Sequence, residues 1–272
     1  MRARLMNGAG NKFILADLRD RAVTIALSPD DVREMAARHG FDQLLLLERS
    51  DSADAFMRIW NADGIEVGAC GNGTRAAGWA LMEDAGTDAA SIDTVGGRLQ
   101  AGRAGAWSVS VDMGTPRLDW QDIPLARAMD TVSLDYAAEA DGQRVSAPGA
   151  VNMGNPHAVF FVDNVETMPL DRLGPAIETD PLFPQRVNAG FAQIVDRSHI
   201  RLKVWERGTG LTAACGTGAC AALVAAHRRG LTGRSADIRA DGGVLHIDWR
   251  ASDGHVILTG PVEDEGDVEI TL

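Results

Sequence analysis

The sequence predicts an α+β protein made of two tandem copies of one half-domain, each built on an antiparallel sheet. Two observations indicate the repeat: a ten-residue segment occurs twice, and matched residues recur at a nearly constant offset in a chain of 272 residues. A third indicates the class: short strand-like runs bounded by turn glycines outnumber helix-like runs, unlike the alternating strands and helices of a parallel α/β sheet.

The repeated segment reads ACGNGTRAAG from Ala69 to Gly78 and ACGTGACAAL from Ala214 to Leu223. Matched residues recur at offsets of 144 to 146: Asn11 with Asn155, Gln43 with Asn188, Trp60 with Trp205, Asn61 with Glu206, Cys70 with Cys215, and Gly96-Gly97 with Gly242-Gly243. A steady offset over most of a chain is the signature of an internal repeat. We expect one half from 1–115 with a C-terminal strand at about 262–272, a second half from 116–261, and a cleft between them.

In the first copy, Ser28 is a good N-cap for a helix from Pro29 to His39. A short strand is predicted from Phe56 to Trp60, followed by the cysteine loop. A helix then runs from about Thr74 to Asp84, and Gly86 ends it. Short strands separated by glycine turns follow, at 91–114.

In the second copy, Ile200 to Trp205 alternates apolar and basic residues, as a half-buried strand does. A helix is expected from about Gly218 to Arg229, whereas Met168 to Pro184 reads as a less regular stretch containing prolines. Short strands follow at 236–260. Both central helices are rich in alanine and glycine, so we expect strands to wrap them closely.

Cys70 and Cys215 each stand directly before a helix start. Exposed N–H groups and the positive end of the helix dipole favour a thiolate and bind anions. Two such thiols facing each other could remove a proton from one face of a substrate carbon and return it on the other face. A single nucleophilic cysteine, with His157 as its base, would not explain why both copies keep the cysteine. Cys220 falls on a different helix face and is interpreted as packing.

Composition and spacing argue against several other classes. The formal net charge of −12 is unlike that of proteins that bind nucleic acid or anionic membranes. No apolar run is long enough to span a bilayer, and the N-terminus does not read as a secretory signal, so a cytoplasmic protein is expected. The spacing of Cys215 and Cys220 does not suit zinc, so no metal is expected. Lys12 and Lys203 are the only lysines, and Lys203 points outward from its strand, which favours a route without pyridoxal phosphate or another cofactor.

Four segments resemble the diaminopimelate epimerase family. They are Gly10-Asn11, the run NADGIEVGACGNGTR, the GNPH of Gly154 to His157, and VWERGTGLTAACGTGA. The resemblance covers the whole chain in the family's order. It implies two pseudo-symmetric halves, each an antiparallel sheet around a central helix, with the active site in the cleft between them. It also implies cofactor-independent interconversion of LL- and meso-diaminopimelate, in lysine and peptidoglycan precursor biosynthesis, with Cys70 and Cys215 as acid and base.

The chemistry of the residues agrees with this resemblance. A carbanion at an amino acid Cα needs its developing charge stabilised, and N–H groups of Gly71-Asn72 and Gly216-Thr217 could serve at the two helix starts. Glu206 could hold the substrate ammonium group, and Arg207 a distal carboxylate. His157 is expected to tune thiol protonation. The remaining substrate-binding candidates are side-chain amides: Asn11, Gln43, Asn61, Asn72, Asn155 and Asn188.

Other readings stay open from the sequence. A proline racemase-like enzyme would keep the fold and change the substrate, but Arg207 and the amides favour a substrate with a polar distal end. A relative of the phenazine-biosynthesis isomerase type would lack the paired cysteines. A non-catalytic amino-acid-binding module would keep the amides and Arg207 without needing two thiols. A homodimer is compatible with the sequence, which does not fix the assembly.

Overall fold

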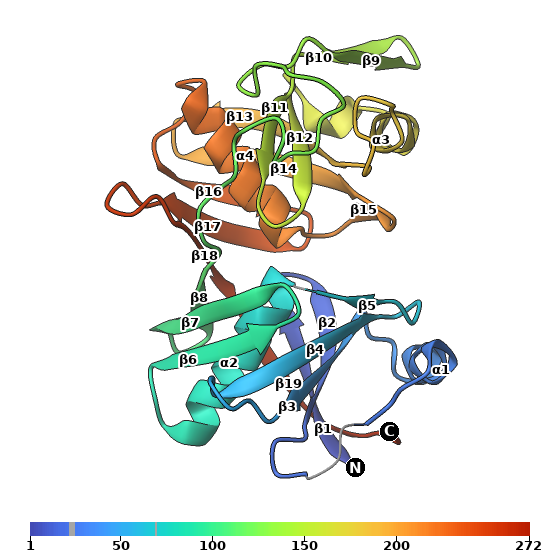
Figure 1. Ribbon diagram of the computed structural model, residues 1–272, viewed down its shortest axis with the longest axis vertical. Coiled ribbons are helices and arrows are strands. Elements are labelled where there is room, and N and C mark those ends of the chain that lie inside the picture. Colours follow the sequence, from blue (N-terminus) through green and yellow to red (C-terminus); the bar gives the residue numbers. More distant parts are fainter. Residues whose placement is uncertain (22–24, 69) are drawn as a thin grey trace. The chain divides into compact units, whose positions relative to one another are not determined.

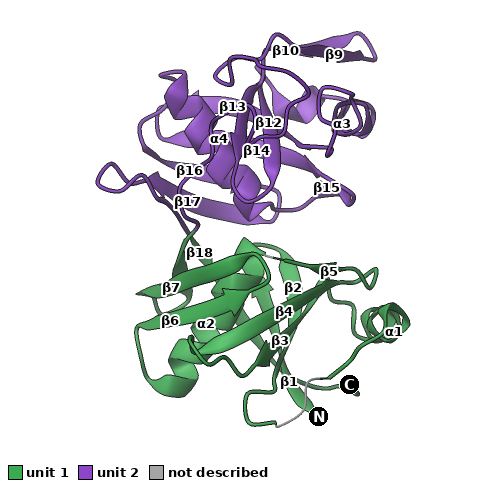
Figure 2. Cartoon of the chain, in the orientation of Figure 1, with its two compact units in different colours: residues 1–112, 259–272 green, residues 113–258 purple. Residues whose placement is uncertain are grey.

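The computed structural model describes residues 1–21, 25–68 and 70–272, so Ala69, the first residue of the first repeated segment, lies outside the described residues. The chain forms two compact units, Met1–Asp112 with Thr259–Leu272 and Met113–Leu258 (Figure 2). The chain re-enters the first unit within strand β18 (Val256–Pro261). The division predicted from the sequence lies three residues later at both crossings.

The first unit contains a central helix, an outer helix and strands of two to nine residues (Figure 1). The helices are α1 (Pro29–His39) and α2 (Gly71–Ala85). The strands are β1 (Arg2–Gly8), β2 (Asn11–Asp17), β3 (Gln43–Glu48), β4 (Ala55–Asn61), β5 (Glu66–Val67), β6 (Ala89–Thr94), β7 (Gly97–Gly105), β8 (Ser108–Asp112) and β19 (Glu263–Glu269).

The second unit repeats this plan and adds a short hairpin. Its helices are a 3₁₀ turn at Val165–Thr167, α3 (Leu170–Glu178) and α4 (Gly216–Arg228). Its strands are β9 (Ala137–Ala140), β10 (Gln143–Ser146), β11 (Gly149–Asn152), β12 (Pro156–Phe161), β13 (Asn188–Asp196), β14 (His199–Glu206), β15 (Gly210–Thr212), β16 (Ser235–Ala240) and β17 (Gly243–Trp249).

Strand pairing follows the same order in both units. In the first, β1, β2, β3, β4, β6 and β7 are successive neighbours, and β5 adds to β4. In the second, the equivalents are β11, β12, β13, β14, β16 and β17, with β15 added to β14. The predicted α+β class with two pseudo-symmetric halves is therefore confirmed. The purely antiparallel sheet is wrong, because β2–β3, β4–β6, β12–β13 and β14–β16 are parallel pairs joined by connections that include a helix.

The register of the pairs also repeats. Phe13 lies opposite Gln43 in one parallel pair, and His157 lies opposite Asn188 in the other. Gln43 and Asn188 were matched in the sequence at an offset of 145, and Phe13 and His157 are 144 residues apart, as Asn11 and Asn155 are. The predicted internal repeat is thus a repeat of backbone pairing, and it sets equivalent side chains at equivalent strand positions of each unit.

The two central helices are enclosed by strands, as the small side chains predicted (Figure 1). Every residue of α2 from Gly71 to Met82 is buried. A Cβ added at Gly78 would lie 2.4 Å from the Ala101 Cβ on β7, so only glycine allows this approach. In α4, ten residues between Gly216 and Ala226 are buried. Close wrapping fixes the helix starts, where the cysteines lie, against the sheet.

Each sheet carries a second helix on its other face. Val32 and Met35 of α1 pack in one core cluster with Leu44 and Leu46 of β3, which explains why β3 reads as a continuous apolar run. The helix predicted at Pro29–His39 is confirmed, with Ser28 as its N-cap.

Helix α3 was missed from the sequence, which reads Met168 to Pro184 as irregular because it contains prolines. Pro175 lies inside this nine-residue helix. Leu173 and Ile177 are buried in the core of the second unit. Packing of this apolar face therefore outweighs the hydrogen bond that proline removes.

Candidate active site

Both repeated cysteines are N-cap residues. Cys70 has extended backbone angles (φ −150°) before α2, and Cys215 (φ −125°) before α4. The helices begin at Gly71 and Gly216, earlier than predicted, because the Gly-x-Gly residues form the first helical turn rather than a preceding loop. The first N–H groups of α2 and α4 therefore point toward the N-terminal end of each helix, where the cysteine lies.

Glycine at the third helical position brings the backbone close to each sulfur. The Gly73 N–H donates to Cys70 Sγ at 3.3 Å. A Cβ at Gly218 would lie 3.2 Å from Cys215 Sγ and 2.9 Å from Val204. The Thr74 N–H bonds to the Cys70 carbonyl, and the Ala219 N–H to the Cys215 carbonyl. The N–H groups that precede these in each turn, on Gly71-Asn72 and Gly216-Thr217, are those that an anionic group could use.

The Cys215 thiol is not acidified in this unit, contrary to the prediction for a helix start. Burial raises the pKa of the thiol well above its ordinary value, and the adjacent Glu206 carboxylate raises it further. Cys215 is 6% exposed. Desolvation and a neighbouring negative charge both disfavour a thiolate, and here they outweigh the helix dipole.

Glu206, at the end of β14, lies beside Cys215. Its Oε1 accepts a hydrogen bond from Thr212 Oγ1 at 2.5 Å. Burial raises the pKa of the Glu206 carboxyl, whereas hydrogen bonds from Thr212 and Cys215 lower it. A half-buried carboxylate facing a thiol is suited to hold a cationic group or to accept the thiol proton.

His157, on β12, is fully buried. Its Nε2 lies 2.9 Å from Asn155 Oδ1 and 3.1 Å from Thr217 Oγ1. Burial, and to a smaller extent the positive charge of Arg207, lowers the pKa of His157 to about 3. The imidazole is therefore neutral at neutral pH, next to the start of α4.

Asn188 and Arg207 lie together at the turn after β14. Asn188 Nδ2 donates to the Pro156 carbonyl at 2.8 Å, and Asn188 Oδ1 accepts from the Arg207 N–H at 2.9 Å. Arg207 Nη1 donates to the Gln185 carbonyl at 3.0 Å, while its side chain is otherwise exposed. Asn188 thus holds the turn that carries Arg207.

The first unit has its own set of polar side chains. Asn72 Nδ2 donates to Asn11 Oδ1, and Asn72 Oδ1 accepts from Arg75 Nη1 at 2.9 Å. Arg75 is fully buried, and it was not among the site residues predicted from the sequence. The available signal was an arginine within an alanine- and glycine-rich helix, three residues after Asn72.

Gln43 and Asn61 form the remaining predicted pair. Gln43 Nε2 donates to Asn61 Oδ1 at 2.8 Å between neighbouring strands. Gln43 Oε1 is buried and has no hydrogen-bond partner among the described residues, so this oxygen is ready to accept one. The first unit thus brings together Asn11 with Asn72 and Gln43 with Asn61, and the second brings together Asn155, His157, Thr217, Cys215 and Glu206.

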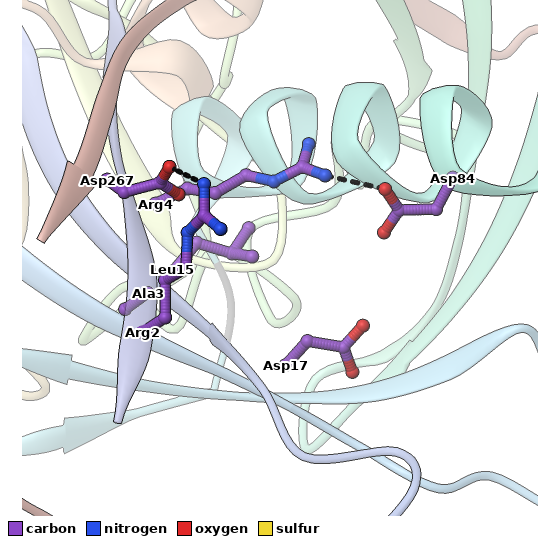
Figure 3. A pocket seen from close by; sticks show the side chains of 7 residues that line it. All are labelled: Arg2, Ala3, Arg4, Leu15, Asp17, Asp84 and Asp267. Atoms are coloured by element: carbon purple, nitrogen blue, oxygen red, sulfur yellow. Dashed lines mark hydrogen bonds and ion pairs between the residues drawn. The ribbon is translucent and has the colours of Figure 1, made fainter. Parts of the chain in front are cut away.

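A pocket of about 380 Å³ in the first unit contains none of these residues (Figure 3). Its charged groups are already paired: Arg2 with Asp267, and Arg4 with Asp84 at 2.6 Å. This pocket is therefore a poor candidate for the reaction site. Within the described residues, no three His, Cys, Asp or Glu side chains are grouped as metal ligands, and no helix has the length and apolar character needed to cross a bilayer.

Comparison with known proteins identifies the family. The family model described as diaminopimelate epimerase matches residues 4–118 and 149–264, one block in each half of the chain. The chain belongs to the diaminopimelate epimerase family. The resemblance seen in the sequence motifs is thereby confirmed, and the two matched blocks follow the internal repeat.

Individual relatives agree with the family match. The diaminopimelate epimerase of Phenylobacterium zucineum is 53% identical over 257 residues, covering 94% of this chain and 92% of the relative. Among solved structures, a hydroxyproline epimerase from Agrobacterium vitis has a TM-score of 0.71 at 16% identity, covering 99% of this chain and 90% of that one. A PhzF-family phenazine biosynthesis protein from Bacillus anthracis has a TM-score of 0.68 at 13% identity, covering 100% and 99%. These two structures share the fold of the diaminopimelate epimerase family member described here.

Proposed function

We propose that this chain interconverts LL- and meso-2,6-diaminopimelate without a cofactor, with Cys70 and Cys215 as the two acid–base groups. The observation that supports this most is the pair of repeat-matched thiols, each the N-cap of a buried helix, in a member of this family. One thiol would take the proton from Cα while the other delivers a proton to the opposite face. The product of this step lies in lysine and peptidoglycan precursor biosynthesis.

The helix starts supply the electrostatic part of this mechanism. Removing the Cα proton places negative charge on the substrate carboxylate as an enediolate forms. The N–H groups of Gly71 and Asn72, and those of Gly216 and Thr217, would donate to these oxygens. They belong to rigid, buried helices, so they would need little rearrangement as the charge develops.

Protonation of Cys215 follows from its surroundings. Because burial and Glu206 raise the pKa of this thiol, Cys215 would enter the reaction as the proton donor. The substrate ammonium group would lie near Glu206 and offset the carboxylate charge that opposes a Cys215 thiolate. His157, neutral and buried, would act on thiol protonation through its neighbours rather than as a base.

Polar groups away from the reacting carbon would select the substrate. Arg207 is exposed on a turn held by Asn188, and it would bind the distal carboxylate through two parallel hydrogen bonds. The amides of Asn11, Gln43, Asn61 and Asn155 would complete the contacts. A compact ring such as proline would leave these groups without partners, which would cost affinity.

Solvent deuterium uptake at Cα tests this function. The enzyme is incubated in D₂O with LL-diaminopimelate, meso-diaminopimelate or proline, and mass spectrometry measures the label. We expect label in both diaminopimelate isomers, together with interconversion, and none in proline. Label in proline alone would indicate a proline racemase-like enzyme, and binding of diaminopimelate without label would indicate an amino-acid-binding module.

We further propose a cytoplasmic enzyme whose partner is the small-molecule substrate, without nucleic acid or membrane. A homodimer is the proposed assembly. Sedimentation velocity on the purified chain tests it, because a single species near the monomer mass of 28.9 kDa at micromolar concentration would contradict the dimer.

A further inference from the structure

The hydroxyl of Thr217 lies between two groups of the second unit. Thr217 Oγ1 is 3.6 Å from Cys215 Sγ and 3.1 Å from His157 Nε2. The same Nε2 is 2.9 Å from Asn155 Oδ1. The other ring nitrogen, His157 Nδ1, is buried and has no hydrogen-bond partner among the described residues. These four facts determine where the hydrogens lie.

A neutral imidazole carries one proton, and the surroundings of His157 assign it to Nε2. A proton on Nδ1 would leave a buried N–H without an acceptor, and an Nε2 lone pair facing the Asn155 oxygen. A proton on Nε2 instead lies between two oxygen acceptors and leaves only a lone pair unsatisfied at Nδ1. A buried donor without a partner is the rarer and more costly case.

The Nε2–H tautomer of His157 determines which way the Thr217 hydroxyl donates. Because Thr217 Oγ1 accepts from His157, its own hydrogen is available for another group, and Cys215 Sγ is the acceptor within reach. We propose that Thr217 is a positioning residue whose hydroxyl, held by the Nε2–H of His157, donates a hydrogen bond to the Cys215 thiolate. The inference rests on the proposed function only in taking Cys215 as an acid–base group. Thr217 keeps its own proton: the proton given to Cα comes from the Cys215 thiol, and the Thr217 hydroxyl then donates to the thiolate that remains.

The hydroxyl acts against Glu206 and in the same direction as the Gly218 N–H, which also favours a Cys215 thiolate. Glu206, from β14, opposes a thiolate through its charge. His157, from β12, is neutral, and Arg207, from the turn after β14, is the cation that acts on the imidazole. Thr217 therefore supplies a hydrogen bond that favours the thiolate after Cys215 has given up its proton.

Among the described residues of the first unit, no hydroxyl and histidine take the places of Thr217 and His157. By the repeat, Asn72 stands at the position of Thr217 and Phe13 at the position of His157. The Asn72 side chain bonds to Asn11 and Arg75 instead. The two thiols are therefore tuned by different neighbours, and a change at Thr217 should affect Cys215 alone.

Thiol alkylation measures this effect without substrate. The full-length protein is treated with iodoacetamide from pH 6 to 10, and peptide mass spectrometry follows Cys70 and Cys215 separately. Thr217→Val keeps the shape and removes the hydroxyl. Because the pKa of the Cys215 thiol already lies well above its ordinary value, the rates are compared below it, where Cys215 should react about tenfold more slowly at each pH. Thr217→Ser should restore the wild-type profile, and Cys70 should be unchanged in both variants.

A double-mutant comparison tests the part played by His157. His157→Phe should slow Cys215 alkylation when Thr217 is present and add nothing in the Thr217→Val background. Should the valine variant not fold, Thr217→Ala against Thr217→Ser gives the same contrast. With diaminopimelate, the loss should fall on kcat rather than KM.

The inference is overturned if Thr217→Val leaves the Cys215 profile within twofold of wild type, or if Thr217→Ser behaves like Thr217→Val. Its failure can be distinguished from failure of the proposed function. Alkylation needs no substrate, so an enzyme that does not epimerise diaminopimelate could still show the Thr217 effect. An active epimerase without the effect would refute Thr217 alone.

Discussion

Replacing His157 should change how the stability of this protein depends on pH. Burial holds the pKa of His157 at about 3 in the folded chain, against about 6.5 for histidine in an unfolded chain. Between these values the unfolded chain binds a proton that the folded chain does not. The free energy of unfolding therefore falls as the pH falls through this window, and the contribution is fully present only above pH 6.5.

The size of the effect follows from the pKa difference. Each pH unit well below 6.5 costs about 1.4 kcal/mol, so acidification from pH 6.5 to 4.5 costs about 2 kcal/mol through His157 alone. His157→Phe removes this proton-binding site and introduces the residue found at the matching position, Phe13. The variant also loses the bonds to Asn155 and Thr217, which lowers stability by a similar amount at each pH.

Urea unfolding at pH 4.5, 5.5, 6.5 and 7.5 measures this prediction. The wild type should be more stable than His157→Phe at pH 7.5, and the difference should shrink by about 2 kcal/mol between pH 6.5 and pH 4.5. His39→Gln, in the last turn of α1, serves as the matched control for removing a histidine. The change in pH dependence seen with this control is subtracted as the general effect of removing a histidine.

A difference between wild type and His157→Phe that stays constant to within about 0.5 kcal/mol would refute the reasoning. It would mean that His157 takes up its proton in the folded protein as easily as in the unfolded one. The imidazole would then be accessible or charged, and the argument for a neutral ring beside Thr217 would fail as well.

Three further predictions concern the reaction and the fold. Cys70→Ala and Cys215→Ala should each abolish epimerisation in the diaminopimelate assay while leaving thermal unfolding near wild type, because one thiol cannot reach both faces of a planar carbanion. Arg207→Ala should raise KM for diaminopimelate roughly 10- to 150-fold, the equivalent of about 1.5–3 kcal/mol for a charge-assisted contact. Gly78→Ala should destabilise the protein by about 1–3 kcal/mol in urea unfolding, since its Cβ would lie 2.4 Å from that of Ala101.

Matched variants give these predictions their controls. Cys220→Ala, in the helix that Cys215 caps, should keep epimerisation. Near-normal turnover in Cys70→Ala or in Cys215→Ala would contradict the two-base mechanism. Arg207→Lys keeps the charge but loses the paired N–H donors of the guanidinium, so its KM should fall between those of the wild type and Arg207→Ala. An unchanged KM in Arg207→Ala would exclude contact between Arg207 and the substrate. Gly233→Ala should be tolerated, because its Cβ would meet nothing nearer than 3.9 Å. An equal loss of unfolding free energy in Gly78→Ala and Gly233→Ala would contradict the packing argument.

The sequence by itself determined the repeat and the residues that recur in it. A constant offset needs no three-dimensional information, and it selected Cys70, Cys215 and the pair of Phe13 with His157 that the strand registers later matched. Alanine- and glycine-rich composition likewise predicted the closely wrapped helices, because small side chains leave room for strands on every side.

Only the tertiary structure decided what surrounds these residues. The parallel pairs depend on which strand edges meet, and α3 forms despite Pro175 because its apolar face packs into the core. The high pKa of the Cys215 thiol and the neutral His157 arise from burial and from Glu206 and Arg207 nearby. Local sequence predicts a helix start and its dipole. Desolvation and the nearness of charges depend on residues that only the fold brings together, and here they decide the protonation states of Cys215 and His157.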